Sequence, residues 1–222
     1  KTVEDELESI YSPDETKIYY LTEGKVNVGS QKQEENAVNI CCENLYPKTP
    51  IINNEMINRV VISTAQTKKA RLNIIDAIIQ KNDTEDFYSG TNQEATVYRS
   101  VFCQTGLIRN GTDSNLGEII EKLNTFVDSC SDNKMSFSNI IKKLTKAPYG
   151  MRLGVIPLLL AKVLSERGED LVAYFANMEV PITPEIIVNM CEKPEEYSLF
   201  VSKRDHEKEL YIHHLNDLFG VN

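Results

Sequence analysis

Residues 147–164 read APYGMRLGVIPLLLAKVL, and the organisation of the whole chain depends on them. Apolar residues fill nearly every position from Val155 to Leu164, so a helix made from them has no polar face to turn toward water. The unbroken apolar run ends at Lys162, far short of the roughly 20 residues that a bilayer-spanning helix needs. Ala147-Pro148-Tyr149-Gly150 forms a turn before it. We therefore expect a helix through about Glu166 that is buried inside the protein.

Shorter patterns flank this helix on both sides. Upstream, Ser136 caps a helix that turns Phe137, Ile140, Ile141 and Leu144 inward. Downstream, the sequence predicts a strand at 171–176, a helix from Thr183-Pro184-Glu185 to about Glu192, a strand at 198–202 and a terminal helix at 206–219. The order helix, turn, helix, strand, helix, strand is close to a winged-helix plan.

The first part of the chain is helical after a small hairpin. The residues KIYYLTEGKVNV at 17–28 predict two short strands around Thr22-Glu23-Gly24. Capping signals then predict four helices, at about 30–46, 64–81, 91–106 and 113–130. Ser63 or Thr64 caps the second, and a Thr91–Glu94 capping box opens the third. We expect a mainly α, α+β chain: a hairpin plus helical bundle at 1–132 and a winged-helix-like α+β domain at 133–222.

The segment TPIINNEMINR at 49–59 raises the question of a polar site. Pro47 and Pro50 end one helix, and we expect Ile51 and Ile52 to follow as extended, buried residues. Asn53 or Asn54 can cap a short helical turn, and Asn58 and Arg59 can bond back to carbonyl groups. The segment is therefore predicted to be a junction between helices, with a functional role still open for Asn54 and Arg59.

Basic residues gather in two acid-free stretches, although the 222-residue chain has a net charge of −9. The stretches are 134–165 and 56–75, and the candidates there for contact with DNA or a partner protein are Lys142, Lys143, Lys146, Arg152, Arg59, Lys68, Lys69 and Arg71. Such islands suit phosphate contact and equally suit docking onto an acidic protein surface. Direct base reading is not expected, because the second helix of the pair is too apolar to enter a groove.

No catalytic or metal-binding motif appears in the sequence. Walker A, G-x-S-x-G and H-E-x-x-H patterns are absent. The five Cys show no C-x-x-C spacing and are expected to be reduced thiols. The three His lie at 206, 213 and 214 without a ligand partner, and the acidic pairs Glu118/Glu121 and Glu195/Glu196 have no partner motif for a nuclease. We therefore expect no enzyme activity, no cofactor and no metal.

Four stretches in this order carry a family resemblance: TPIINNEMINR, TKKARLNIIDAII, SGTNQEATVYRSVFCQTGL and APYGMRLGVIPLLLAKVL. As spaced motifs over roughly residues 17–220, the ensemble resembles a region of the large P-loop ATPases of bacterial phage-defence systems, the BREX proteins BrxC and PglY. That region lies outside the nucleotide-binding core and contributes helical and winged-helix-like parts. The resemblance implies a role in a cytoplasmic, DNA-associated antiviral machine and supplies no catalytic residues.

Three functions of different class follow as expectations. The first is a non-catalytic regulatory or interaction module of such an ATPase, whose partners are other domains of the parent chain, defence-system proteins or the DNA backbone, and not a membrane. Because the chain begins at Lys1 and not at Met, we expect it to be a piece of a longer protein. The alternative is a stand-alone protein-interaction adaptor with no nucleotide or DNA binding. The third is an enzyme, which would need a deep pocket that gathers several carboxylates.

Overall fold

The computed structural model describes residues 20–22, 24–26, 38–39, 42–111, 114, 116–131, 133–167, 170–202 and 214. The chain forms two compact units, one made of Lys1–Thr49 with Ala147–Gly150 and the other of Pro50–Lys146 with Met151–Asn222. Within the described ranges, no helix has both the length and the hydropathy to cross a bilayer. The predicted boundary near residue 132 stays a prediction.

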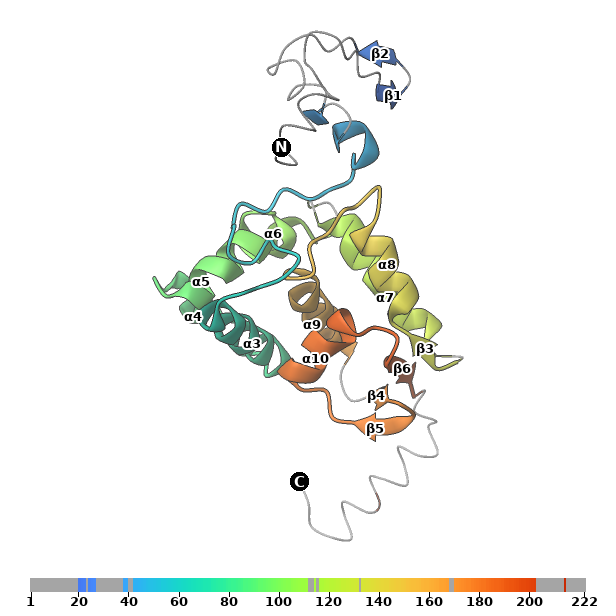
Figure 1. Cartoon of the computed structure of the whole chain (residues 1–222). Coiled ribbons are helices and arrows are strands. Elements are labelled where there is room, and N and C mark those ends of the chain that lie inside the picture. Colours follow the sequence, from blue (N-terminus) through green and yellow to red (C-terminus); the bar gives the residue numbers. More distant parts are fainter. Residues whose placement is uncertain are drawn as a thin grey trace, which may run out of the picture. The chain divides into compact units, whose positions relative to one another are not determined.

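The larger unit is mainly helical and carries a small antiparallel sheet, which confirms the expected α+β class (Figure 1). Its helices are α3 (Ala65–Ile79), α4 (Glu85–Ser89), α5 (Gln93–Tyr98), the π-helix η1 (Arg99–Cys103), α6 (Leu107–Asn110), α7 (Gly117–Ser129), α8 (Ser138–Thr145), α9 (Ile156–Arg167) and α10 (Pro184–Glu192). The strands β3 (Met135–Ser136), β4 (Leu171–Phe175), β5 (Met178–Val180) and β6 (Tyr197–Val201) form a sheet in the order β3-β6-β4-β5.

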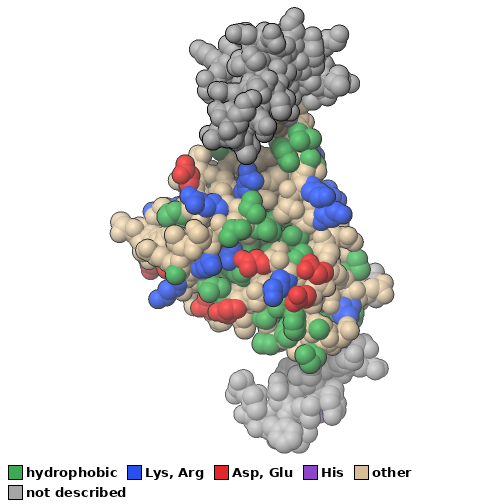
Figure 2. Space-filling model, in the orientation of Figure 1, with side chains coloured by type: hydrophobic (Ala, Val, Ile, Leu, Met, Phe, Trp, Pro, Cys, Tyr) green, Lys and Arg blue, Asp and Glu red, His purple; other side chains and the backbone are tan. Residues whose placement is uncertain are grey.

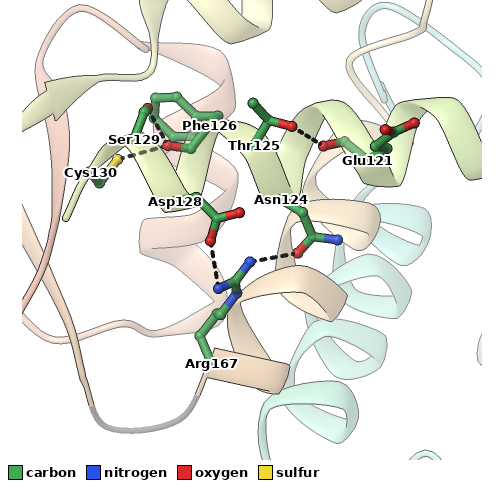
Figure 3. Close-up of polar contacts among 8 residues, drawn as sticks. All are labelled: Glu121, Asn124, Thr125, Phe126, Asp128, Ser129, Cys130 and Arg167. Carbon is green, nitrogen blue, oxygen red and sulfur yellow. Dashed lines mark hydrogen bonds and ion pairs between the residues drawn. The ribbon is translucent and has the colours of Figure 1, made fainter. Parts of the chain in front are cut away.

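Helix α9 is the centre of the core. All of its residues from Ile156 to Ala161 are buried, as are Val163 and Leu164, which confirms the buried helix predicted from its sequence. It packs against α3, α7 and α10. At its end, Arg167 forms an ion pair of 2.7 Å with Asp128 of α7 and donates a 3.3 Å hydrogen bond to Asn124 (Figure 3). The helix that has no polar face is therefore enclosed by its neighbours.

Helix α8 and the sheet follow the predicted hydrophobic pattern, but the predicted cap is wrong: the cap residue of α8 is Phe137, and Ser136 belongs to β3. Phe137, Ile140, Ile141 and Leu144 are all buried, as their spacing predicts. The predicted strands at 171–176 and 198–202 correspond to β4 and β6, which pair antiparallel with the buried Ala173 opposite the buried Leu199. Strands β3 and β5 were not predicted, because two and three residues are too short to show an alternating pattern.

Helix starts show which capping predictions hold. Thr64 caps α3 and Thr183 caps α10, each accepting a hydrogen bond from a backbone N–H in the first turn. The cap of α5 is Asn92 and not Thr91, since the Asn92 side chain accepts from the Ala95 N–H at 2.9 Å. Helix α7 begins at Gly117, after Leu116, which is later than the predicted start at 113–114.

The prediction that Ile51 is buried is wrong. Its side chain is 72% exposed, whereas Ile52 is only 6% exposed and Ile57 is completely buried. Neighbouring side chains of an extended segment point to opposite sides, so a chain that buries Ile52 turns Ile51 outward. The junction therefore enters the core through Ile52 and Ile57.

The smaller unit is described only in part. Tyr20–Thr22 (β1) and Gly24–Val26 (β2) pair antiparallel, which confirms the predicted hairpin strands. Residues 38–39 and 42–45 are helical, within the helix predicted at 30–46. In the same unit, the Lys48 N–H donates a hydrogen bond to the Pro148 carbonyl at 3.1 Å. Apart from His214, the terminal helix predicted at 206–219 lies outside the described residues.

Candidate interaction surfaces

The exposed side of α8 carries Lys142 and Lys143, and Lys146 follows at its end; we call these three residues the α8 lysine face. All three are exposed, and none forms an ion pair with another described residue. Basic side chains gather over α8 at the upper right of Figure 2. Cations at the C-terminal end of a helix also stabilise its dipole. The face is thus free to meet an anion, and it has a structural role besides.

Two more basic residues of the 134–165 stretch are Arg152, which precedes α9, and Lys162, which lies within it. Arg152 is exposed just before the helix, and its carbonyl accepts a hydrogen bond from the Val155 N–H at 3.0 Å. Lys162 is held by Asp83, with 3.6 Å between the Nζ and the carboxylate oxygen. Of these two, Arg152 remains a candidate for outside contact.

The basic residues of the 56–75 stretch differ in how exposed their side chains are. Lys68 and Lys69 are exposed on α3. Arg59 is also exposed, and its Nε donates to the Glu55 carbonyl at 2.6 Å. Arg71 is only 5% exposed, and its Nη2 forms a 3.0 Å ion pair with Glu192. An arginine placed in this way is unsuited to contact a flat external surface, but it can contact a ligand that enters the groove beside it.

A groove of about 570 Å³ runs between α3 and α10, and we call it the α3–α10 groove. Its apolar lining is Val60, Val61, Ile62, Leu72, Leu153 and Val188. Its polar lining is Lys68 and Arg71 from α3 with Glu185, Asn189 and Glu192 from α10. On the face shown in Figure 2, hydrophobic side chains reach the surface between acidic and basic ones.

Sequence reasoning did not predict the groove. Its lining comes from three separate parts of the chain, residues 60–72, residue 153 and residues 185–192, so no local spacing reveals it. One local signal was available: Val60-Val61-Ile62 is an apolar run that precedes the helix cap at Thr64, outside any helix or strand pattern. Burial raises the pKa of Cys191, which lies next to Glu192 in the sequence, so this thiol is a packed core group and not a nucleophile.

The segment TPIINNEMINR is a junction held by its own polar groups, as predicted. The Asn54 Oδ1 accepts from the backbone N–H groups of Met56 at 3.1 Å and Ile57 at 3.3 Å. The Asn54 Nδ2 donates to Ser100 Oγ at 2.9 Å, and the Asn58 Nδ2 donates to the Ile52 carbonyl at 3.2 Å. These hydrogen bonds stabilise the conformation of the segment and connect it to η1.

Asn54→Ala should lower the free energy of unfolding by about 2 kcal/mol, the combined loss of a cap and a buried hydrogen bond. The change strands the buried Ile57 N–H and removes the donor to Ser100. Urea denaturation measures the effect. The matched control is Asn53→Ala, because Asn53 is exposed and should change stability by less than about 0.5 kcal/mol. Equal midpoints for the two variants would contradict the cap.

A second polar cluster links α5 to α9. Tyr98 donates a 2.7 Å hydrogen bond to the Asp83 carboxylate, which also pairs with Lys162. Burial, followed by the hydrogen bond and charge of Asp83, raises the pKa of Tyr98. Tyr98 is 2% exposed, so no substrate reaches its hydroxyl. In the part of the chain that the structure describes, no three His, Cys, Asp or Glu side chains gather in a way that could hold a metal ion.

Comparison with known proteins found no relative. No protein-family model matches the chain, and neither a curated protein nor a solved structure is similar to it. The resemblance to the phage-defence ATPases therefore stays a prediction.

Proposed function

We propose that this chain is a non-catalytic interaction module of a large, cytoplasmic phage-defence P-loop ATPase, and that it contacts the DNA backbone through the α8 lysine face. The observation that carries the proposal is the state of these three lysines. They stand exposed and without ion pairs among the described residues, on a helix whose other side is buried. Lysines in this state can neutralise phosphates and release counterions, which is the main source of sequence-independent DNA affinity.

The topology of the larger unit supports a winged-helix-like arrangement. A winged helix orders its elements as helix, strand, helix, helix, strand, strand, and α7, β3, α8, α9, β4 and β6 follow that order. The sheet order β3-β6-β4 also suits this plan, with β5 and α10 inserted before the last strand. In this proposed arrangement the winged-helix-like part begins with α7, before the predicted boundary at 132.

The position of α9 favours contact with phosphates over contact with bases. In this plan α9 takes the place of the helix that enters the major groove. Here it packs against α3, α7 and α10, and most of its side chains are buried. A helix covered in this way cannot present side chains to base edges. We therefore propose binding without sequence preference, since phosphate contacts position a protein but carry no sequence information.

The test is binding to duplex DNA over a series of salt concentrations. With the α8 lysine face and Arg152 engaged, a log–log plot of affinity against salt should have a slope of about −3 to −4. Replacing Lys142, Lys143 and Lys146 by Gln should bring the slope to about −1, because each lost phosphate contact removes about 0.9. Fluorescence anisotropy with a labelled duplex measures both.

The matched control replaces Lys81, Lys122 and Lys193 by Gln. This variant has the same net charge, but its changes are spread over three other parts of the structure. It should keep most of the salt dependence of the unmodified chain. Absence of binding at about 50 mM salt would remove DNA from the proposal. An equal loss in both variants would show that only the total charge matters.

A second candidate is docking of the α8 lysine face onto an acidic protein surface, in a stand-alone adaptor or within the ATPase. The net charge of −9 favours it, because an acidic body repels DNA. The complete reading frame separates adaptor from module. A Walker A loop elsewhere in the same frame supports the ATPase module, and a complete frame without one contradicts it.

A further inference from the structure

We infer that the α3–α10 groove binds an extended peptide segment of a partner protein, which places an apolar side chain in the groove, an acidic residue beside Lys68 and a basic residue beside Glu185. This site is separate from the α8 lysine face and goes beyond the proposed function. Four features of the groove carry the inference: its exposed apolar edge, the free backbone of that edge, a buried arginine with an unused donor, and the arrangement of its charges.

The edge of the groove exposes apolar side chains that a folded chain normally covers. Val60 is 55% exposed and Val61 is 74% exposed, whereas the adjacent Ile62 is 4% exposed and anchors the segment. Leu72, Leu153 and Val188 continue the apolar lining inward from this edge. Apolar surface bordered by polar residues is typical of a binding groove.

The backbone of this edge is also unused. No N–H or C=O group of Val60, Val61 or Ile62 forms a hydrogen bond with another described residue. An extended peptide has free backbone donors and acceptors and can pair with such a segment, as in the addition of a strand. A helical partner pairs its own backbone groups internally and could not use these positions. The edge therefore favours an extended partner over a helical one.

Arg71 provides a further donor at the groove. Its side chain is nearly completely buried, its Nη2 is paired with Glu192, and its Nε has no hydrogen-bond partner. Buried donors in folded proteins are nearly always paired. A carbonyl or carboxylate oxygen of a bound peptide would supply the missing acceptor after a small shift of the guanidinium group. Asn189, on the opposite wall, adds an amide that can pair with peptide backbone.

The charges on the two walls of the groove set the direction in which the peptide lies. Because Arg71 and Glu192 pair with each other, Lys68 on α3 and Glu185 on α10 are the exposed charges left without a partner among the described residues. A peptide with an acidic residue on the α3 side and a basic residue on the α10 side matches both. Complementary charges of this kind orient a partner more than they tighten it.

A displayed library of random dodecapeptides, selected on the intact chain, tests the inference. Enriched peptides should share an apolar residue next to Asp or Glu, and a labelled synthetic copy should bind in an anisotropy assay. Val61→Asp should weaken binding by at least about tenfold, because it places a charge at the apolar edge. The matched control is Ile108→Asp on α6, where the side chain is 48% exposed outside the groove. It should leave the affinity unchanged, as should the Gln variant of the α8 lysine face.

Three further measurements separate the extended peptide from other occupants. Selection on the Lys68→Glu variant should replace the acidic residue by Lys or Arg. Methylation of single peptide nitrogens should weaken binding, and NMR signals of the Val60–Ile62 amides and the Arg71 Nε–H should shift on titration. The inference would be overturned if no peptide were enriched, or if the enriched peptides bound the Val61→Asp variant as tightly as the unmodified chain. So would peptides with apolar residues at helical spacing that tolerate methylation, since these would indicate a helix.

Discussion

Gly154→Ala is expected to destabilise the protein by about 3 kcal/mol or more, at the upper end of the range for overpacking a core. A Cβ added at Gly154 would lie 2.1 Å from the Ile57 carbonyl oxygen and 3.0 Å from the Arg59 carbonyl oxygen. Both atoms belong to backbone, so no flexible side chain can move aside. The Gly154 N–H also donates to the Arg59 carbonyl at 2.8 Å, and this hydrogen bond would be strained or lost.

The matched control for this substitution is Gly90→Ala. A Cβ there would have its nearest neighbour at 3.6 Å, an ordinary contact, so stability should change by less than about 0.5 kcal/mol. Urea denaturation followed by circular dichroism compares the two variants. An unchanged midpoint for Gly154→Ala would mean that residues 57–59 are not held against the start of α9.

The close approach at Gly154 has a consequence for the groove. Residues 57–59 lead directly into Val60 and Val61, which form the groove edge. Holding Ile57 and Arg59 against Gly154 therefore sets where that edge lies. Two of the stretches that carry the family resemblance, at 49–59 and 147–164, meet at this point.

Tyr98→Ala is the second large effect, with an expected loss of about 4 kcal/mol, as for other buried aromatic residues cut to alanine. Tyr98 is 2% exposed. Its ring stacks on Tyr88 with centroids 5.3 Å apart and meets Phe102 at 4.6 Å and Phe87 at 5.7 Å. Removing the ring leaves a cavity among three aromatic neighbours. Thermal or urea denaturation measures the loss, and a change below about 1 kcal/mol would contradict the packing role.

Tyr98→Phe is the matched control, because it keeps the ring and removes only the hydroxyl that donates to Asp83. The expected cost is about 1 kcal/mol, the net value of one hydrogen bond. The raised pKa of Tyr98 also predicts that stability depends on pH. The folded pKa of Tyr98 is raised above the unfolded value of about 10, so its contribution is complete below pH 10 and is lost as the pH rises above it. Above pH 10 the native chain should therefore lose stability more steeply than Tyr98→Phe.

Several elements could be predicted from the sequence because the interactions that form them join residues only a few positions apart. The spacing of Phe137, Ile140, Ile141 and Leu144 predicts one buried face on α8, and the same spacing places the α8 lysine face outside. The caps at Thr64 and Thr183 follow from side chains that bond within one turn. The cap of α5 was misassigned because Thr91 and Asn92 are adjacent, and both residue types can cap a helix.

Tertiary structure decided the features that depend on distant parts of the chain. Sequence indicated that α9 is buried, because apolar residues surround it, but not that α3, α7 and α10 cover it. Arg71 belongs to a basic stretch in the sequence and is nonetheless buried, because Glu192, which lies 121 residues later, comes within 3.0 Å. The α3–α10 groove exists only once these helices pack. Hydrophobic pattern and capping act within a few residues, whereas ion pairing and groove shape depend on which helices become neighbours.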